Sequence, residues 1–315
     1  MLTRIIRITC SRFATIIFGL FLTFGPVVAL CQQQQDESSR QIVLDRFNKA
    51  RPADAPVTIT NRPRNRGNSA AMRRPVYRRT GPGIKLSAGL DSEDIGVTVW
   101  RLRPARQTDQ GGRLLVIEGA KQTQLTPERI EADTTLSVGD RVRLTVESPR
   151  PGYLYIIDRE QYADGTFGQP MMIFPTLRTR DGDNRVRPGK LIDIPAQEDE
   201  YSYFTAQPAG DRRDQVAEVL TVILLTNPLQ VPIGPQPAAL TANQFSEWEK
   251  LWGGTVERLE LIGGAGQTWT DAEKAASAVN GRQLTQAGPP PQTVYRIGRK
   301  AGGPLLVTVP LRYAR

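Results

Sequence analysis

The side chains that enzymes most often use for nucleophilic and metal-assisted chemistry are scarce in this sequence. The 315 residues include no histidine, and the two cysteines are Cys10 and Cys31. Without histidine the chain cannot form a Ser-His-Asp or Cys-His nucleophile system, and zinc or haem sites that need imidazole ligands are excluded. The side chains that remain for chemistry are carboxylates, hydroxyls, lysines and arginines.

Two carboxylates can still hydrolyse a glycosidic bond when one acts as general acid and the other as base or nucleophile. Glu147, Asp158 and Glu160 are candidates, but their spacing does not select a pair. Signatures of other enzyme classes are absent, and the glycines of residues 263–266 are too few for a dinucleotide-binding fingerprint. We therefore predict that the chain is not an enzyme and has no catalytic residue, cofactor or metal ion. The alternative is a secreted, carboxylate-dependent glycan hydrolase.

Three aspartates stand in segments with turn-like composition. Asp164, Asp181 and Asp183 could ligate calcium, because hard cations bind carboxylate and carbonyl oxygens. The spacing of an EF-hand is not met, since Gly182 directly follows Asp181. Ordinary turn chemistry explains these residues better.

Two tyrosines on one predicted strand are candidates for contact with a carbohydrate. Tyr153 and Tyr155 are two positions apart, so they point to the same face of a strand over residues 153–157. They are either core residues whose hydroxyls reach backbone groups or a platform on which sugar rings stack. The second interpretation, with the aspartates, makes a calcium-dependent carbohydrate-binding module the other alternative.

The elements that would position these side chains are mainly strands. Residues 141–147 alternate between apolar and polar side chains, which predicts a strand with one buried and one solvent-exposed face. Apolar runs at residues 153–157, 216–226 and 305–309 predict further strands, and turn residues separate them. We predict a mainly β fold, an antiparallel β-sandwich or barrel-like domain over residues 86–315.

Two short helices are predicted as an insertion near the C-terminus, at about residues 240–282. Thr241 and Gln244 have the spacing of a capping box, and so do Thr270 and Glu273. Apolar residues follow each box at helical spacing. The insertion should pack on the side of the β-rich domain.

Residues 1–31 have the features of an export signal. Arginines and no acidic residue occupy the first twelve positions, and an apolar run over residues 13–30 precedes the polar Gln32. We predict cleavage before Gln32, which leaves a cysteine-free protein that is periplasmic, envelope-associated or extracellular. An uncleaved membrane anchor and a lipoprotein acylated at Cys31 are the alternatives, and both would attach the protein to the membrane.

Residues 32–85 are predicted to form a disordered arm that is rich in arginine and proline. Within it, residues 51–79 hold eight arginines, and Asp54 is their only acidic residue. Such a segment is either a solvated linker or an arm attracted to anionic polymers of the cell envelope. The expected contacts with an anionic surface are Arg62, Arg64, Arg66, Arg73, Arg74, Arg78 and Arg79. Nucleic acid would suit the charge equally well, but export makes it an unexpected partner.

An ordered series of short motifs runs through residues 135–225. It comprises Gly152-Tyr-Leu-Tyr155, Asp164-Gly165, Phe174-Pro175, Asp183-Asn184 and Ile194-Pro195. This order resembles the bacterial domain-of-unknown-function family 4384. The resemblance implies a β-rich, exported or envelope-associated domain, which in other chains stands beside caspase-like or kinase modules that are not recognisable here. The family has no established activity, so the motif residues are expected to have structural roles.

Together these features predict an exported, non-catalytic β-rich domain. Its partner would be an unknown envelope protein or an anionic polymer. The charge outside the arm and the signal is close to neutral, so any selectivity must come from the folded region.

Overall fold

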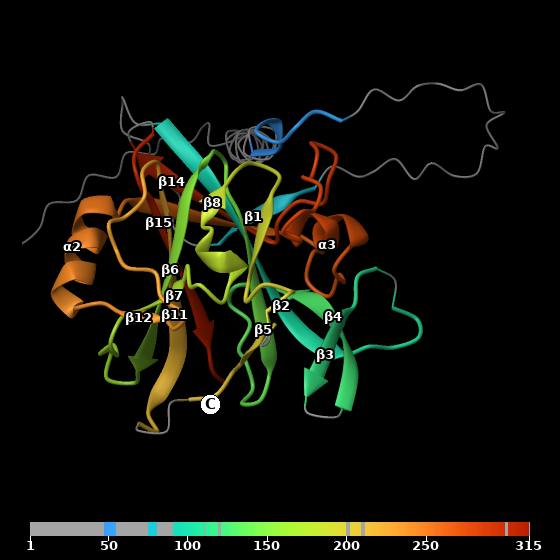
Figure 1. Cartoon of the computed structure of the whole chain (residues 1–315), viewed down its shortest axis with the longest axis horizontal. Helices are drawn as coiled ribbons and strands as arrows, with labels where there is room; N and C mark the ends of the chain where they lie inside the picture. The colour runs from blue at the N-terminus through green and yellow to red at the C-terminus, as the bar shows by residue number, and fades with distance from the viewer. Residues whose placement is uncertain are drawn as a thin grey trace, which may run out of the picture. The chain divides into compact units, whose positions relative to one another are not determined.

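The described part of the chain forms two antiparallel β-sheets in the computed structural model shown in Figure 1. The residues described are 47–54, 75–80, 91–109, 111–118, 121–199, 202–208, 212–299 and 302–314. All of them belong to one structural unit, Arg40–Arg315. The predicted export signal lies outside the described residues. Among the residues described, no helix has the length and apolar character needed to cross a lipid bilayer.

The first sheet is built around the long strand β2. Its order is β1 (Tyr77–Thr80), β13 (Thr255–Leu261), β14 (Thr293–Arg299), β2 (Asp91–Pro104), β4 (Lys121–Ile130) and β3 (Leu114–Glu118). A further strand, β5 (Arg141–Glu147), also pairs with β2, and it continues to β9 (Leu191–Ile194) and β10 (Phe204–Thr205). This sheet thus joins segments from both ends of the described chain.

The second sheet is centred on β6 and β11. Its order is β12 (Ala238–Ala239), β7 (Met171–Phe174), β6 (Gly152–Tyr162), β11 (Gln215–Leu225) and β15 (Leu305–Arg312), with β8 (Arg185–Val186) also paired to β6. The helices that lie wholly within the described residues are η1 (Arg180–Gly182), α2 (Ala242–Trp252) and α3 (Asp271–Ser277). In Figure 1, α2 lies beside the second sheet at the left and α3 lies at the right.

The core lies between the inner faces of the two sheets. Val142, Leu144 and Val146 of β5 point inward and share one cluster with Ile156 and Val222 of the second sheet. Alternation with a period of two places such residues on one face of each strand. The predicted antiparallel β-sandwich is therefore confirmed.

The outer face of β5 is buried, which corrects the prediction of a solvent-exposed face. Arg143 is 1 % exposed, and its guanidinium lies 5.2 Å from the ring centre of Trp269, just before α3. The guanidinium also forms an ion pair with Asp193, at 3.2 Å. The charged side chains on the outer face of β5 are therefore surrounded by a second layer of protein groups and not by water.

The C-terminal insertion is not purely helical. Both predicted helices form, and the Thr241 and Thr270 hydroxyls accept backbone hydrogen bonds at their first turns. Between them, however, β13 enters the first sheet and pairs with β1 and β14. Polar and apolar residues alternate along β13, which buries Leu259 and Leu261 on one face. The sequence prediction of a helical insertion overlooked this alternation.

Parts of the predicted disordered arm are in fact packed on the domain. Residues 75–80 contain β1, and Tyr77 is fully buried with its hydroxyl donating to the Pro291 carbonyl at 2.7 Å. Residues 47–54 begin with a helical turn whose Phe47 is 3 % exposed. The prediction for residues 32–85 is therefore wrong at these positions, because isolated aromatic residues anchor them. The rest of the arm lies outside the described residues.

Candidate functional site

The inner face of the second sheet changes from apolar to acidic along β6. Ile156 belongs to the core, and the next residues on the same face are Asp158 and Glu160. On the neighbouring strand β11, Glu218 lies directly opposite Glu160, and Leu220 lies opposite Asp158. The strand register therefore brings three carboxylates together at one end of the core.

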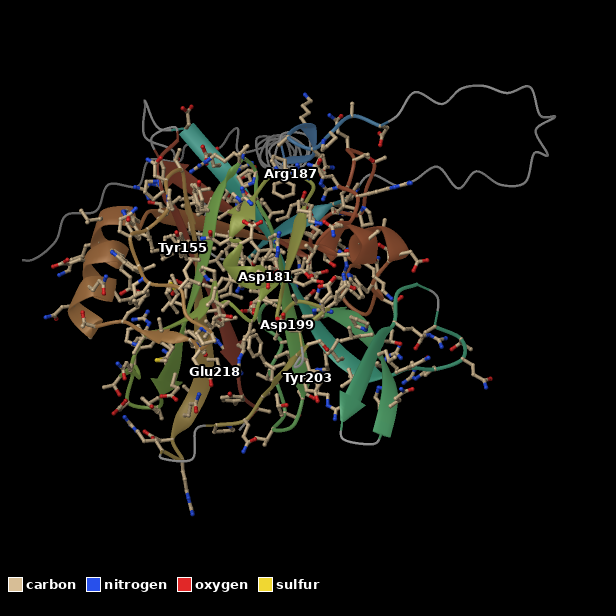
Figure 2. All side chains as sticks on the ribbon, in the orientation of Figure 1. Tyr155, Asp181, Arg187, Asp199, Tyr203 and Glu218 are labelled. Atoms are coloured by element: carbon tan, nitrogen blue, oxygen red, sulfur yellow. The ribbon has the colours of Figure 1, made fainter. Side chains whose placement is uncertain are left out.

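A pocket of about 110 Å³ opens between the two sheets at this end. Asp158 and Glu218 supply its carboxylates, and Tyr313 supplies a hydroxyl. The other walls come from both sheets and are mostly apolar: Leu136, Val142, Ile173, Phe204, Thr205, Ala206, Leu220 and Leu311. Glu218 lies in the lower half of Figure 2, away from Arg187 at the top of the view.

The two pocket carboxyls share one environment. Burial raises the pKa of Asp158 well above its ordinary value, and the nearby charge of Glu218 and a hydrogen bond with it raise the pKa further. Burial also raises the pKa of Glu218, although Gln215 and Tyr313 donate to its Oε1 at 2.7 and 3.2 Å. Those two bonds favour the ionised form of Glu218, so they oppose the effect of burial on its pKa.

The remaining oxygens of the pair lack hydrogen-bond donors within the described part of the chain. Asp158 Oδ1 and Glu218 Oε2 are buried and receive no hydrogen bond from an N–H or O–H group of the described residues. Two carboxylates this close cannot both be ionised without a large cost. A proton shared between them would give both oxygens a partner and leave the pair with a single negative charge.

Glu160 is engaged elsewhere and does not line the pocket. The Tyr162 hydroxyl donates to its Oε2 at 2.5 Å, and this bond raises the pKa of Tyr162 to about 12. The guanidinium of Arg212 lies 3.6 Å from the centre of the Tyr162 ring and forms ion pairs with Asp164 and Asp214. Arg212 thereby joins the turn after β6 to the segment before β11.

The predicted tyrosine pair belongs to a core. Tyr155 is 2 % exposed and accepts a hydrogen bond from the Leu229 amide at 2.7 Å, and Tyr153 packs against the same cluster. That cluster contains Phe245 and Trp248 of α2. As predicted, the two rings share a face, but this face is covered by the helix and offers no open platform for a sugar.

Other motif residues also stabilise the fold. A Cβ atom on Gly152 would lie 2.6 Å from the Leu225 carbonyl oxygen, so only glycine fits there. The Asn184 side chain donates to the Leu154 carbonyl at 3.0 Å, which ties the following turn to β6. Gly165 has a φ of +84°, which its turn requires.

The two Phe-Pro and Ile-Pro motifs end their strands with cis peptide bonds, Phe174–Pro175 and Ile194–Pro195. Phe174 is fully buried in the main core. The Pro195 carbonyl accepts a hydrogen bond from Arg143 Nε at 3.1 Å. These motifs therefore position strand ends against buried groups.

The three candidate calcium ligands do not converge. Asp164 accepts from Thr166 and pairs with Arg212, whereas Asp183 pairs with Arg185 at 2.8 Å. In the part of the chain that the structure describes, no group of three or more acidic side chains is arranged to hold a metal ion. Asp181 lies in η1 with a φ of +53°, as part of a tight turn.

Two of the seven arginines expected to contact an anionic surface are placed by the structure. Arg78 pairs with Glu131 at 2.5 Å, and Arg79 pairs with Glu257. Each charge thus has a carboxylate partner within the domain, while both side chains stay partly exposed, at 46 and 36 %. Contact with an anionic surface remains a prediction for these two. The other five lie outside the described residues: Arg62, Arg64, Arg66, Arg73 and Arg74.

Sequence reasoning named Asp158 but missed Glu218 and Tyr313. Glu218 interrupts the inward-facing series of an otherwise apolar strand, which is a detectable signal for a buried charge. Tyr313 carries no such signal, because its position depends on how the end of the chain crosses the sheet.

Comparison with known proteins identifies one family. The model described as "Domain of unknown function (DUF4384)" matches residues 135–217, which confirms the resemblance seen in the motifs. No curated protein and no solved structure matches the chain. The matched stretch contains Asp158 and ends just before Glu218, so the pocket includes residues on both sides of that boundary.

Proposed function

We propose that this protein is an exported, non-catalytic binding domain of the cell envelope, and that its pocket takes a primary ammonium group on a short apolar stem. The observation that carries this proposal is the Asp158–Glu218 pair in an otherwise apolar pocket. Carboxylates attract cations, and the apolar walls favour a hydrocarbon stem.

The proton that the pair holds is the best guide to its ligand. An ammonium group brings a positive charge and three N–H donors to oxygens that otherwise need a shared proton. Binding would therefore release that proton and ionise both carboxyls. The Tyr313 hydroxyl, already bonded to Glu218 at 3.2 Å, would keep its contact.

The same geometry gives less support to the two alternatives. A glycosidase must hold a sugar ring between two carboxyl groups that are roughly 5 Å or more apart, whereas the pocket beside Asp158 and Glu218 has a volume of only about 110 Å³. Calcium takes six to eight oxygen ligands, and this pocket offers only two carboxylates. Binding of an organic cation requires neither widely spaced carboxyl groups nor six oxygen ligands.

The proposed export and the proposed location in the cell envelope rest on the sequence alone. Residues 1–31 read as a signal, and the arginines between residues 62 and 74 would hold the domain near an anionic polymer. The pocket would then select among envelope components that carry amino groups. An envelope protein with an exposed lysine fits this description.

Calorimetric titration with n-butylammonium tests the proposal, with n-butanol as the uncharged probe. We expect binding of the ammonium ion only, proton release that depends on the buffer, and tighter binding at higher pH. Glu218→Gln or Asp158→Asn should weaken binding by roughly tenfold or more, because each removes one charge-assisted hydrogen bond.

Glu249→Gln is the matched control, since it removes a carboxylate from α2 outside the pocket. It should leave the affinity unchanged. Equal binding of butanol and butylammonium, or equal losses in all three variants, would contradict the proposal.

A further inference from the structure

Residues 47–54 lie against the outer face of the first sheet, where Arg51 contacts Glu147 of β5 and Phe47 lies beside Gly96 of β2. They are drawn in blue at the top of Figure 1. Phe47 and Arg51 are their buried side chains, at 3 and 2 % exposure. No backbone ladder joins this segment to a strand among the described residues. Phe47 and Arg51, four positions apart, are the side-chain anchors of this segment. The backbone adds two contacts, because the Pro52 carbonyl accepts from the Gln286 amide at 3.1 Å and the Arg51 carbonyl accepts from the Gln286 side chain at 3.3 Å. A peptide ligand is anchored in a groove in the same way.

The Arg51 guanidinium has a complete set of acceptors. Its Nε and Nη2 donate to the two oxygens of Glu147, each at 2.7 Å. Nη1 donates to the Gly288 carbonyl, and Nη2 also donates to the Pro289 carbonyl, both at 3.0 Å. This two-pronged contact with a carboxylate matches an arginine and not a lysine.

The receiving site is held in place by the domain itself. Glu147 Oε1 also accepts from the Gly189 amide at 3.3 Å, and the Leu284 amide donates to the Gly189 carbonyl at 2.7 Å. Gly96 leaves room for the phenylalanine, because a Cβ atom there would lie 2.9 Å from the Phe47 ring. Arg187, close to Gly189 in the chain, is labelled at the top of Figure 2, which is the end at which residues 47–54 lie in Figure 1.

The groove is larger than the segment that occupies it. A cavity of about 180 Å³ remains beside Phe47 and Ala50. Its other walls are Ser92, Glu93, Asp94, Pro149 and Arg150. The segment therefore fills the arginine site fully and the neighbouring space only in part.

We propose that this face is a peptide-binding site that recognises a phenylalanine and an arginine four residues later, and that it exchanges residues 47–54 between two copies of the chain. Every copy carries the segment, and an exchanged segment would make the same contacts as the resident one. Residues 55–74 connect Asp54 to the chain before β1, and a chain of that length reaches at most roughly 70 Å. The site is separate from the carboxyl pocket and does not depend on its function.

The first test supplies the segment as a synthetic peptide of residues 45–56. Arg51→Ala in the full chain vacates the arginine site, and the peptide should bind this variant in a one-to-one complex and raise its Tm. A peptide with citrulline at position 51 keeps the shape without the charge and should bind at least tenfold more weakly. Failure of the arginine peptide to bind, or equal binding of the two peptides, overturns the proposal.

The second test addresses the partner. The Arg51→Ala chain keeps an intact Glu147 site but has a damaged segment. The Glu147→Gln chain keeps an intact segment but has a damaged site. A mixture of the two should form a heterodimer in light scattering, while each variant alone stays monomeric. A mixture that stays monomeric overturns exchange between copies.

A folding control keeps both tests interpretable. The removal of Arg51 leaves Glu147 buried without its partner, so Arg51→Ala could unfold the chain. Arg51→Lys keeps the charge and loses the two-pronged contact, and it should bind the arginine peptide by displacing its own segment. Absence of peptide binding to a folded Arg51→Lys chain would again count against the site.

Discussion

Asp158 and Glu218 occupy diagonal positions on the paired strands β6 and β11, and their carboxyls meet at the inner face of the second sheet. The interior of the sandwich is otherwise apolar around them. A buried acidic pair in such surroundings reduces stability unless a proton or a cation accompanies it. This relationship links the fold to the proposed ligand.

The pair should make stability fall as pH rises. Unfolded carboxyls titrate near pH 4, whereas both pKa values are raised in the folded protein, so the folded state binds more protons above pH 4. Asp158→Asn supplies a permanent N–H donor to Glu218 and should weaken this decline. We expect a gain on the order of 1 kcal/mol relative to wild type at pH 7.5 and little difference at pH 4, measured by urea unfolding. Equal pH profiles for the two proteins would refute the buried pair.

Gly152→Ala should destabilise the fold. The added Cβ atom would lie 2.6 Å from the Leu225 carbonyl oxygen and 3.0 Å from the Leu224 side chain, so β6 and β11 must shift apart. Overpacking of this kind costs about 1–3 kcal/mol. Gly234→Ala is the matched control, because its nearest atom is 4.0 Å away. Chemical denaturation of both variants measures the difference, and equal effects would contradict the packing argument.

The two motif tyrosines should respond differently to loss of the hydroxyl. Tyr155→Phe leaves the Leu229 amide without its acceptor and should cost about 0.5–1.5 kcal/mol. Tyr153→Phe removes a hydroxyl from the same cluster, where packing carries the contact, and should change the free energy of unfolding by less. Thermal unfolding of both variants tests this, and a larger loss for Tyr153→Phe would reverse the assignment.

Limited proteolysis should distinguish two parts of the arginine-rich arm, strand β1 and residues 62–74. Arg78 and Arg79 lie on β1, which pairs with β13 from Tyr77 to Thr80, and local unfolding must precede cleavage there. Their ion pairs with Glu131 and Glu257 hold the same strand. We expect trypsin to cut within residues 62–74 first, with mass spectrometry of the products as the readout. Early cleavage after Arg78 would show that β1 is not held on the sheet.

The sequence by itself determined the local structure of this protein. Alternation predicted β5 and the apolar runs predicted β6, β11 and β15, because the side-chain period of a strand is local. The capping-box spacing at Thr241 and Thr270 predicted both helices, since a helix cap spans one turn. The complete box forms at Thr270, whereas at Thr241 the hydroxyl accepts from the Gln244 amide. The ordered motifs predicted the family over residues 135–225, and the family model matches residues 135–217.

Only the tertiary structure decided which polar groups meet. Asp158 reaches Glu218 through the register of β6 with β11, and a slip of one residue would turn the strand's side chains to the opposite face. Arg51 reaches Glu147 across 96 positions, from a segment whose composition indicated disorder. A charge in the sequence does not show whether water or a partner side chain will solvate it, because burial depends on layers that come from distant parts of the chain.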